Sequence, residues 1–566
     1  MYLLFSILVE KTTSFTPPAS QNPNSSDKEK KRFAQVPILL SSIFIIAVCG
    51  ILYELLISSI STYFLGSSIL HFSITIGLFL SAMGLGSFLS RYVYRNLLDW
   101  FVVIETILGL VGGCSTLILY FSYTVLDNYY AVALIIIVFL GAFVGLEIPI
   151  VTRLLKEHDN LKDTISNVLA FDYLGSLVAS VAFPLLLLPF LGLMRTAFFI
   201  GMINLLIAIF NAWVFRKELK NAAAKLAFSG ISMAVLLIGF IYSFQISDFF
   251  EQMMYQDEII YSDQTPYQRI VVTKYKKNTQ LFINGNLQFS TLDEYRYHET
   301  LVHVPALLTG HLENVLILGG GDGLAVRELL KYDEIESIDL VDLDKAITNL
   351  AKHNRIFREV NQNSLANPKV KVYNVDAFKF VEDSEKQYSL IIVDLPDPHE
   401  ASLGKLYSVE FYRLAKKILS KDGVLITQST SPYFAPKPFW CIQKTMQEAF
   451  PSALPANVYV PAFGMWGFSM GINNPKFNQN DSTSIGLPSQ KQLDKIYKEL
   501  TLKMEKRKLD LKYLAPEILP KLFVFDKDMF YDIDFEGTGE GDSIKVNRLD
   551  NQILIQYYEQ SWKRWE

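Results

Sequence analysis

The first half of the chain contains a series of long apolar segments, and these segments constrain the fold more than any other feature. Each is close to the roughly 20 residues that a helix needs to cross the hydrocarbon core of a bilayer. Because backbone groups in lipid must be hydrogen-bonded within their own segment, each is predicted to be a helix. Seven candidate spans are predicted, at about 37–57, 72–92, 101–123, 130–151, 174–193, 196–215 and 226–245.

Small residues recur at four-residue spacing in three of these spans, and such spacing lets neighbouring helices approach closely. The pairs are Ala82 with Gly86, Gly109 with Gly113, and Gly141 with Gly145. The sequence therefore predicts an N-terminal all-α transmembrane helix bundle over residues 36–245. Residues 1–35, which include a stretch rich in Ser, Thr, Asn and Pro, are predicted to be a disordered tail.

Positive charge predicts the orientation of the bundle. Lys28–Arg32 (KEKKR) precede the first span, and the loops after spans two, four and six are also basic, which places these parts in the cytoplasm. Seven spans would then put residues 246–566 outside the cell, whereas the chemistry argued below needs a cytosolic metabolite. We expect a multi-pass protein of the cell membrane whose second half is cytoplasmic, and therefore a miscounted span.

Four acidic residues lie within or at the edges of the apolar segments: Glu54, Glu105, Glu147 and Asp172. Ionisable groups are unfavourable in a membrane and often functional there. One interpretation is a cation site for a polyamine, with Glu54 and Glu147 the stronger candidates. The alternative is an interface pair, or a carboxylate at the end of a span that reaches water.

Charge and cysteine content exclude other classes of protein. Lys and Arg number 52 against 57 Asp and Glu, a net charge of −5, which argues against nucleic acid as the main partner. The cysteines are Cys49, Cys114 and Cys441, and their spacing is neither that of a metal site nor that of a disulfide framework. We expect no metal.

The second half has the composition of a soluble protein. Residues 246–295 are predicted to form a small β-domain, in which Asn284-Gly285 is a hairpin turn. A helix is predicted at 293–309. Strand and helix patterns then alternate from 314 to 428, which predicts an α/β doubly wound, Rossmann-like parallel sheet. Ligands of such sheets bind at the carboxyl ends of the strands.

Carboxylates follow four successive strands of the predicted sheet. A single aspartate at such a place is usually a helix cap or a turn former. The glycine-rich turn after the first strand lacks the Lys-Ser/Thr of a phosphate-binding loop. Four strand ends with carboxylates together favour a nucleoside ligand and a cationic one. The residues are Asp322 after Gly319–Gly321, Asp342 with Asp344, Asp376, and Asp394 with Asp397.

Several motifs together resemble the polyamine aminopropyltransferases, the spermidine synthase family. They are ILGGGDGLAVREL, LVDLD, NVDAF and VDLPDP, with YSDQTPYQRI, INGNLQFS and DEYRYHE upstream. The resemblance covers about residues 261–470 and is to the branch with a multi-pass membrane domain ahead of the enzyme. It implies a class I methyltransferase-like sheet, with a catalytic domain at 296–470 and a C-terminal extension at 471–566.

The resemblance implies that the protein is a transferase of polyamine biosynthesis. The aminopropyl group of decarboxylated S-adenosylmethionine would pass to putrescine, giving spermidine and methylthioadenosine. No cofactor is implied, since decarboxylated S-adenosylmethionine is a co-substrate. The expected partners are these small molecules, the lipid bilayer and further copies of the chain in a homodimer or homotetramer. No nucleic acid is expected.

The resemblance also assigns roles to residues. For the methylthioadenosine part of the donor they are Gln268, Asp342, Asp376 and Ala377, with Asp342 on the ribose hydroxyls and Asp376 with Ala377 on the adenine. For the amines they are Asp322 on the ammonium of the donor, and Tyr297, His298, Gln288 and Asp397 on the acceptor. Asp394 is the expected general base.

Some positions depart from the family pattern. The loop His399–Leu403 replaces a Gly-Pro turn, and Phe463 stands where a tyrosine is common. Trp466 would be an apolar wall for the methylene chain of the diamine, or simply part of the core. Two other functions stay open at this point: a polyamine transporter or sensor that binds the nucleoside without turnover, and a membrane methyltransferase.

Overall fold

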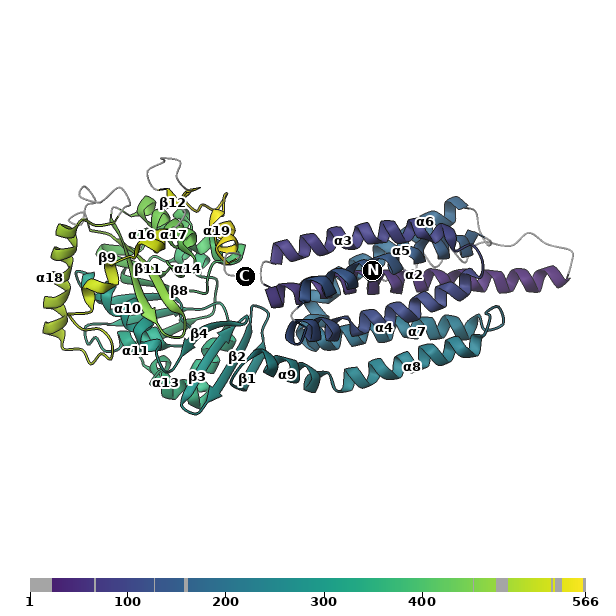
Figure 1. Ribbon diagram of the computed structural model, residues 1–566, viewed down its shortest axis with the longest axis horizontal. Helices are drawn as coiled ribbons and strands as arrows, with labels where there is room; N and C mark the ends of the chain where they lie inside the picture. Colours follow the sequence, from purple (N-terminus) through teal and green to yellow (C-terminus); the bar gives the residue numbers. More distant parts are fainter. Residues whose placement is uncertain are drawn as a thin grey trace. The chain divides into compact units, whose positions relative to one another are not determined.

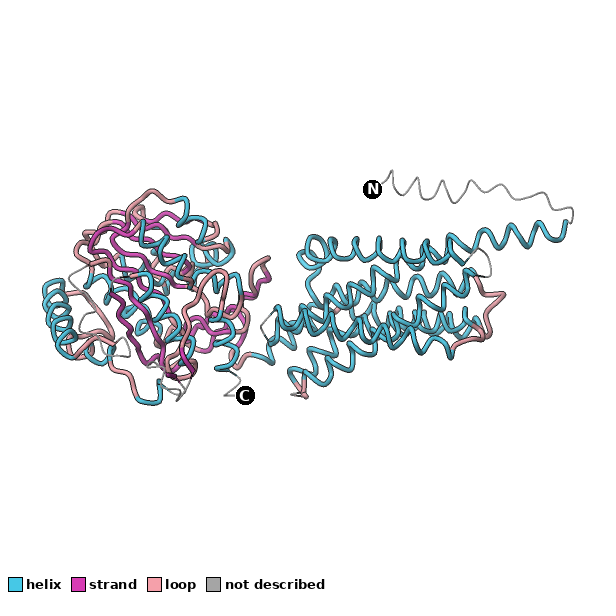
Figure 2. Tube along the Cα trace, turned by 90° about the horizontal axis from the view of Figure 1, so that it is seen from above, coloured by secondary structure: helices cyan, strands magenta, loops and turns pink. Residues whose placement is uncertain are grey.

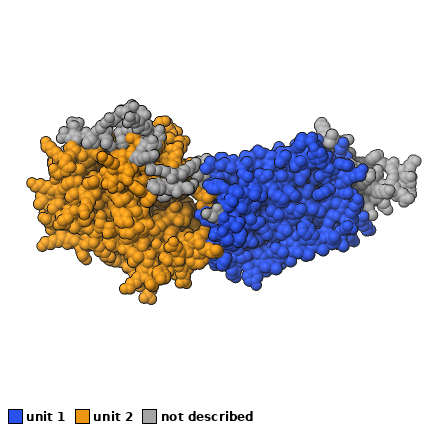
Figure 3. All heavy atoms as spheres, viewed as in Figure 1, with its two compact units in different colours: residues 1–62, 69–251 blue, residues 63–68, 252–566 orange. Residues whose placement is uncertain are grey.

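The computed structural model describes residues 23–65, 68–126, 128–156, 161–450, 452–474, 487–530, 533–534 and 542–562. The chain divides into two compact units, residues 1–62 with 69–251 and residues 63–68 with 252–566 (Figure 3). The described part of the first unit is helical, whereas the second contains the strands (Figure 2). Most of the predicted N-terminal tail lies outside the described residues, and the remainder belongs to the first helix, which begins at Pro23.

Long helices form the first unit (Figure 1). They are α2 (Pro23–Leu65), α3 (Ser68–Leu89), α4 (Leu97–Thr124), α5 (Tyr129–Lys156), α6 (Leu161–Ala182), α7 (Leu188–Val214), α8 (Ala222–Ile241) and the short α9 (Ser243–Met254). Within the described residues, six helical stretches are long and apolar enough to cross a membrane, against seven predicted spans. One of the six, Thr164–Val214, covers both predicted spans 174–193 and 196–215.

The stretch Thr164–Val214 doubles back on itself. Gly175 of α6 packs against Phe44 and Ala47 of α2, and Asn211 of α7 donates a hydrogen bond to Ser42 of the same helix. A straight helix would place Gly175 and Asn211 about 54 Å apart at 1.5 Å per residue. The backbone at Gly192 is non-helical (φ 71°, ψ 178°), and it breaks the stretch into two parts. The difference between six helical stretches and seven spans therefore lies in this one stretch.

The small residues of the bundle lie where helices meet, as their spacing predicts. Gly201 of α7 lies against Gly109 and Gly113 of α4, and Gly145 of α5 lies against the backbone of Met83 in α3. A methyl group at any of these glycines would collide with the neighbouring helix. These contacts confirm that the helices form a packed bundle in which α4 and α7 are in close contact.

The second unit begins with a small antiparallel sheet in the order β1-β2-β3-β4. Its strands are β1 (Glu258–Gln264), β2 (Arg269–Tyr275), β3 (Asn278–Ile283) and β4 (Asn286–Ser290). Asn284 and Gly285 both have positive φ, 49° and 79°, as the predicted two-residue hairpin turn requires. Helix α10 (Glu294–Leu308) follows and confirms the predicted helix.

The main sheet has seven strands in the order β10-β11-β9-β8-β5-β6-β7, and the five from β9 to β7 are parallel. The strands are β5 (Asn314–Gly319), β6 (Ser337–Val341), β7 (Val370–Tyr373), β8 (Tyr388–Asp394), β9 (Leu419–Gln428), β10 (Ser452–Val460) and β11 (Gly464–Ile472). The connecting helices are α11 (Leu324–Leu329), α12 (Lys345–His353), α13 (Arg355–Val360), α14 (Ala377–Asp383), α15 (Ala401–Gly404), α16 (Val409–Lys417) and α17 (Pro436–Ala449). The predicted doubly wound, methyltransferase-like sheet is confirmed.

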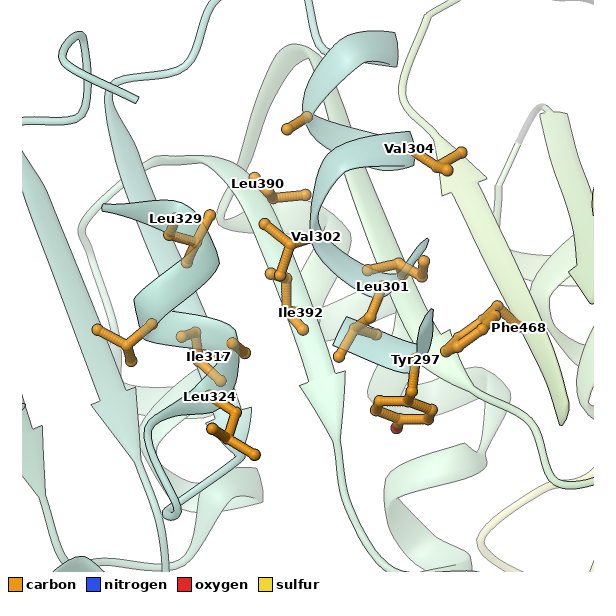
Figure 4. Close-up of a cluster of buried hydrophobic side chains, with 14 of the residues drawn as sticks. Tyr297, Leu301, Val302, Val304, Ile317, Leu324, Leu329, Leu390, Ile392 and Phe468 are labelled. Atoms are coloured by element: carbon orange, nitrogen blue, oxygen red, sulfur yellow. The ribbon is translucent and has the colours of Figure 1, made fainter. Parts of the chain in front are cut away.

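Both faces of this sheet are buried, which explains the continuous apolar runs in its strands. Alternate residues of β5 and β8 face two separate hydrophobic clusters. Ile317 and Ile392 lie in the cluster that includes α10 (Figure 4), whereas Leu318 and Val393 lie in the other. The strand order reverses between β5 and β8, and a crevice at that point is where ligands of open α/β sheets bind.

The C-terminal segment packs onto the same unit. Its helices are α18 (Gln490–Arg507) and α19 (Ile553–Trp562). The carboxylate of Glu299 on α10 accepts hydrogen bonds from the backbone N–H groups of Lys512, Tyr513 and Leu514. Three donors on one buried carboxylate fix this part of the segment against the helix that precedes the main sheet.

Candidate active site

The glycine turn after β5 brings two strand ends together. Gly319 and Gly320 have φ of 83° and 59°, and the N–H of Gly320 donates to the carbonyl of Asp394 at 2.9 Å. A Cβ at Gly319 would collide with that same carbonyl. Glycine is therefore required here both by the positive φ and by the close approach of β8.

Asp394 lies in a cluster of ionisable side chains at the carboxyl ends of β5 and β8. Tyr297 of α10 donates its hydroxyl hydrogen to Asp394 Oδ1 at 2.6 Å. Burial is the largest effect and raises the pKa of Asp394 to about 6. The charge of His298 and the Tyr297 hydrogen bond lower this pKa, and the nearby carboxylate of Asp322 raises it. A carboxylate with this pKa is ionised at neutral pH and can still accept a proton.

Aromatic packing fixes the position of Tyr297. Its ring centroid lies 5.2 Å from that of Phe468 and 6.3 Å from that of Phe463. Figure 4 shows the ring beside Phe468, with the hydroxyl directed away from the hydrophobic cluster. Phe463 in turn lies 5.4 Å from Trp466, so these aromatic rings form one continuous wall beside Tyr297.

Next to Tyr297, His298 is held by a buried ion pair. Its Nδ1 lies 2.8 Å from Oε2 of Glu294, and Arg327 of α11 makes two hydrogen bonds of 2.9 Å to the same carboxylate. Burial alone would lower the pKa of His298, but the hydrogen bond and charge of Glu294 raise it to about 9. His298 is therefore a cation at neutral pH, and its charge faces Asp322 and Asp394.

Replacing Arg327 by methionine is expected to destabilise the second unit by about 3–5 kcal/mol, because the buried carboxylates of Glu294 and Glu328 would each lose a positively charged partner. Hydrogen exchange of the β5 and β8 amides in the full-length protein measures this loss, since core strands exchange through global opening. The matched control is R355M. Arg355 and Glu359 form a pair with side chains 92% and 65% exposed. Equal protection of the strands in R327M and R355M would contradict the stabilising role of the buried pair.

Asp342 follows β6 and accepts backbone hydrogen bonds with both oxygens. The N–H of Gly321 donates to Oδ2 at 3.1 Å and that of Asp344 to Oδ1 at 2.9 Å. Burial nevertheless raises the pKa of Asp342 to about 7, with further contributions from Asp344 and Asp322. Two further hydrogen-bond donors, such as the vicinal hydroxyls of a bound ligand, would favour the ionised form of this carboxylate.

Two other loops of the unit lie at the ends of β6 and β7. Thr265 donates its hydroxyl hydrogen to Asp344 at 2.8 Å, and its N–H donates to the carbonyl of Gln268. The small sheet is thereby attached to the end of β6, with Gln268 in the connecting loop. At the end of β7, Asp376 caps α14 and accepts a hydrogen bond of 2.7 Å from Lys405, while Ala377 is buried.

Asp397, the second carboxylate after β8, has hydrogen-bond partners that the sequence did not identify. Tyr558 of α19 donates to its Oδ2 at 2.9 Å, and Gln428 donates to its Oδ1 at 3.3 Å. Gln428 also donates to the hydroxyl of Tyr407 at 2.8 Å. Burial raises the pKa of Asp397. A residue of the C-terminal segment therefore contacts a strand-end carboxylate of the sheet.

Most of the predicted site residues lie in groups that are connected by hydrogen bonds or by electrostatic interactions. The exception is Gln288. Tyr297 hydrogen-bonds Asp394, and His298 and Asp322 interact electrostatically with that pair. The amide of Gln288 instead donates to Asn286 of its own strand at 3.0 Å. Within the described ranges, no group of three or more His, Cys, Asp or Glu is arranged to hold a metal ion.

Comparison with known proteins finds relatives of the part of the chain that contains this site. Residues 294–483 match the family model described as the spermine/spermidine synthase domain. In solved structures, a spermidine synthase in complex with the transition state analogue AdoDATO is similar over 48% of this chain and 87% of its own, with 24% identity and a TM-score of 0.43.

Curated relatives match both units of the chain. A polyamine aminopropyltransferase of Leptospira interrogans is 42% identical over 93% of this chain and 99% of its own length. Another from Oceanobacillus iheyensis is 37% identical over 94% and 99%. Polyamine aminopropyltransferase 2 of Ralstonia nicotianae is 39% identical over 93% and 98%. Because the match extends through the helical unit and the strand-containing unit alike, the chain belongs to the polyamine aminopropyltransferase family.

Proposed function

We propose that the protein transfers the aminopropyl group of decarboxylated S-adenosylmethionine to putrescine, giving spermidine and methylthioadenosine. The observation that carries this proposal is the half-buried Asp394, hydrogen-bonded to Tyr297 and next to Asp322 at the carboxyl ends of β5 and β8. The names of the relatives support aminopropyl transfer. Methylthioadenosine release that requires both the donor and a diamine is the test.

The reaction needs a base and correct positioning. A nitrogen of putrescine attacks the propyl carbon bound to the sulfonium, a C–N bond forms, and the C–S bond breaks with its electron pair left on sulfur. A protonated amine cannot attack, so Asp394 accepts the proton that the nitrogen loses. The sulfonium is already a good leaving group, and the remaining catalysis is alignment of the two reactants.

The donor would lie across the ends of β5, β6 and β7. In this proposal the carboxylate of Asp342 accepts the ribose hydroxyls, Asp376 and the backbone of Ala377 contact the adenine, and Gln268 contacts the nucleoside from the small sheet. Asp322 binds the ammonium of the aminopropyl group. A methionine carboxylate would meet the charge of Asp322, which favours the decarboxylated donor over intact S-adenosylmethionine.

The diamine would lie between Asp394 and Asp397. These two carboxylates match the two ammonium groups of putrescine, with Tyr297 and His298 lining the site. Trp466 and Phe463 provide an apolar surface for the methylene chain. Gln288 stays a proposed amine ligand whose side chain would have to turn from Asn286. A cluster of carboxylates also attracts a cationic substrate over longer distances.

The acid limb of the pH profile should report Asp394. Because its pKa is about 6 and the base must be ionised, kcat/KM for putrescine is expected to fall as pH drops through about 6. The Tyr297 hydrogen bond lowers that pKa. Y297F should therefore move the inflection to higher pH, whereas Y267F, at an exposed tyrosine, should not. An inflection that stays in place or moves down in Y297F would contradict this role of Tyr297.

Tyr558 is expected to help bind the acceptor through Asp397. Y558F removes a hydrogen bond to a charged group, worth about 1.5–3 kcal/mol, so KM for putrescine should rise about 10- to 100-fold. KM for the donor should stay unchanged. The matched control is Y557F on the same helix, whose hydroxyl accepts from the backbone of Lys545. Equal kinetics in Y558F and Y557F would remove Tyr558 from the amine site.

We further propose that the enzyme is a multi-pass protein of the cell membrane with its second unit in the cytoplasm, where both substrates are formed. This location rests on the substrates alone. Because Thr164–Val214 doubles back, it counts as two spans, and the basic loops would then place the second unit outside. The six apolar helical stretches support the membrane location. A homodimer or homotetramer is the proposed assembly, with the small sheet β1–β4 as a candidate contact.

A further inference from the structure

Two buried glutamates lie near each other inside the helical unit, and among the residues that the structure describes neither has a basic partner. Glu105 of α4 is 0% exposed and Glu147 of α5 is 1% exposed, and their carboxyl groups interact electrostatically with each other. In the described part of the chain, none of their four carboxyl oxygens has a hydrogen-bond partner. Two carboxylates this close cannot both stay ionised in an apolar interior without a positive charge.

Other unpaired oxygen atoms lie around the two glutamates. Tyr53 of α2 is 1% exposed, interacts electrostatically with Glu105 and Glu147, and its hydroxyl has no hydrogen-bond partner among the described residues. Asn204 of α7 donates its amide N–H to the backbone carbonyl of Glu105 at 3.4 Å, and its own Oδ1 is unpartnered within the same residues. Helices α2, α4 and α5 therefore bring unsatisfied polar groups together, and Asn204 of α7 lies beside the backbone of Glu105. Unsatisfied buried polar groups are rare.

A small cavity reaches one side of this cluster. Glu147 lines it together with Asp172 of α6 and apolar side chains of α2 and α5. The space has room for about one water molecule, and its lining is mostly apolar. Of the two glutamates, only Glu147 lines it. The other titratable groups near the pair are the thiols of Cys49 on α2 and Cys114 on α4. None of these neighbours carries a positive charge.

We propose that Glu105 and Glu147, with the hydroxyl of Tyr53 and the amide oxygen of Asn204, form a buried binding site for one monovalent cation. The donor atoms are all oxygen, and one positive charge relieves the repulsion between the two carboxylates. Only two carboxylates take part, and the described residues hold no group of three or more metal-ligand side chains. The chemistry therefore suits a proton, a sodium ion or the ammonium of a small amine better than a dedicated divalent metal site.

Infrared difference spectroscopy of the full-length protein in detergent tests this site, because a protonated carboxyl has its own C=O stretch. The signal of the pair is the part that disappears in E147Q. It is followed across about pH 5 to about 9, which covers the range for buried glutamates. The titration is done with tetramethylammonium chloride as the background salt and with added sodium chloride or methylammonium chloride at constant ionic strength.

The site predicts a protonated signal that decreases as the pH rises. If sodium or methylammonium is the occupant, that ion displaces the proton, and each tenfold rise in its saturating concentration lowers the titration midpoint by about one pH unit. If only the proton binds, the pH titration remains and neither ion moves it. A signal of constant size at every pH and ion concentration would overturn the proposal, because the pair would then be permanently protonated and structural.

Two variants control the assignment. E54Q removes a lone buried carboxyl of α2 and should leave the ion dependence intact. Y53F removes one hydroxyl from the site and should shift the midpoint while the fold is kept. Methylthioadenosine release by E147Q in detergent, at the wild-type rate, shows that the catalytic unit is folded in that variant. A Y53F midpoint identical to that of the wild type, together with a shifted midpoint in E54Q, would place the titrating group elsewhere and overturn the proposal.

Discussion

Replacing Asp394 by asparagine is expected to lower kcat by about 10²- to 10⁴-fold, the usual contribution of a positioned general base. The amide is nearly isosteric with the carboxylate and can still accept the hydrogen bond from Tyr297. It cannot take the proton that putrescine must lose before it attacks. Steady-state and single-turnover rates of methylthioadenosine formation measure the effect on the chemical step itself.

Binding measurements separate loss of the base from loss of the fold. Methylthioadenosine should bind D394N with nearly wild-type affinity, because its proposed contacts lie at Asp342, Asp376 and Ala377. Wild-type turnover in D394N would remove Asp394 as the base. Loss of both turnover and methylthioadenosine binding would instead mean that the variant disrupts the crevice, and D394E would then be needed to test proton transfer.

Replacing Asp322 by asparagine should reduce kcat/KM for decarboxylated S-adenosylmethionine by about 100-fold. A buried ion pair with the aminopropyl ammonium would be lost, and hydrogen bonds to charged groups are worth about 1.5–3 kcal/mol. Asparagine keeps the local structure, because its Oδ1 can still accept from the N–H of Leu324, as Asp322 does at 2.8 Å. The loss should therefore come from the charge rather than from the turn.

Comparing ligands with and without the ammonium and the carboxylate tests the role of Asp322 more directly than the rate alone. Methylthioadenosine lacks the ammonium, so its affinity for D322N should match that of the wild type. The preference for decarboxylated over intact S-adenosylmethionine should narrow, because the repulsion of the methionine carboxylate disappears. Equal loss of affinity for all three ligands would show that Asp322 supports the nucleoside site as a whole and does not contact the ammonium.

The local patterns of the sequence predicted most of the fold. Apolar runs such as VLILGGG indicated β5, and Asn284-Gly285 indicated the hairpin, because both features depend on neighbouring residues. The strand-end positions of Asp322, Asp342, Asp376 and Asp394 followed from the parallel sheet. The count of helical stretches in the membrane region was less predictable, since it depends on how Gly192 breaks one long helix.

Contacts between distant residues could not be predicted in the same way. Arg327 meets Glu294 across 33 positions, and Tyr558 meets Asp397 across 161. Neither pair has a fixed spacing that a motif could show, and a tyrosine near the end of a chain has no special signature. The proximity of Glu105 and Glu147 likewise depends on how α4 and α5 pack, although each glutamate alone was conspicuous in its apolar span.

The most direct test of the account is an assay of the purified full-length protein in detergent with decarboxylated S-adenosylmethionine and putrescine, with cadaverine, agmatine and spermidine as alternative acceptors. We expect equal amounts of methylthioadenosine and spermidine, formed only when decarboxylated S-adenosylmethionine and putrescine are both present. Intact S-adenosylmethionine should be a poor donor. Tight methylthioadenosine binding without turnover on any amine, or turnover with intact S-adenosylmethionine alone, would contradict it.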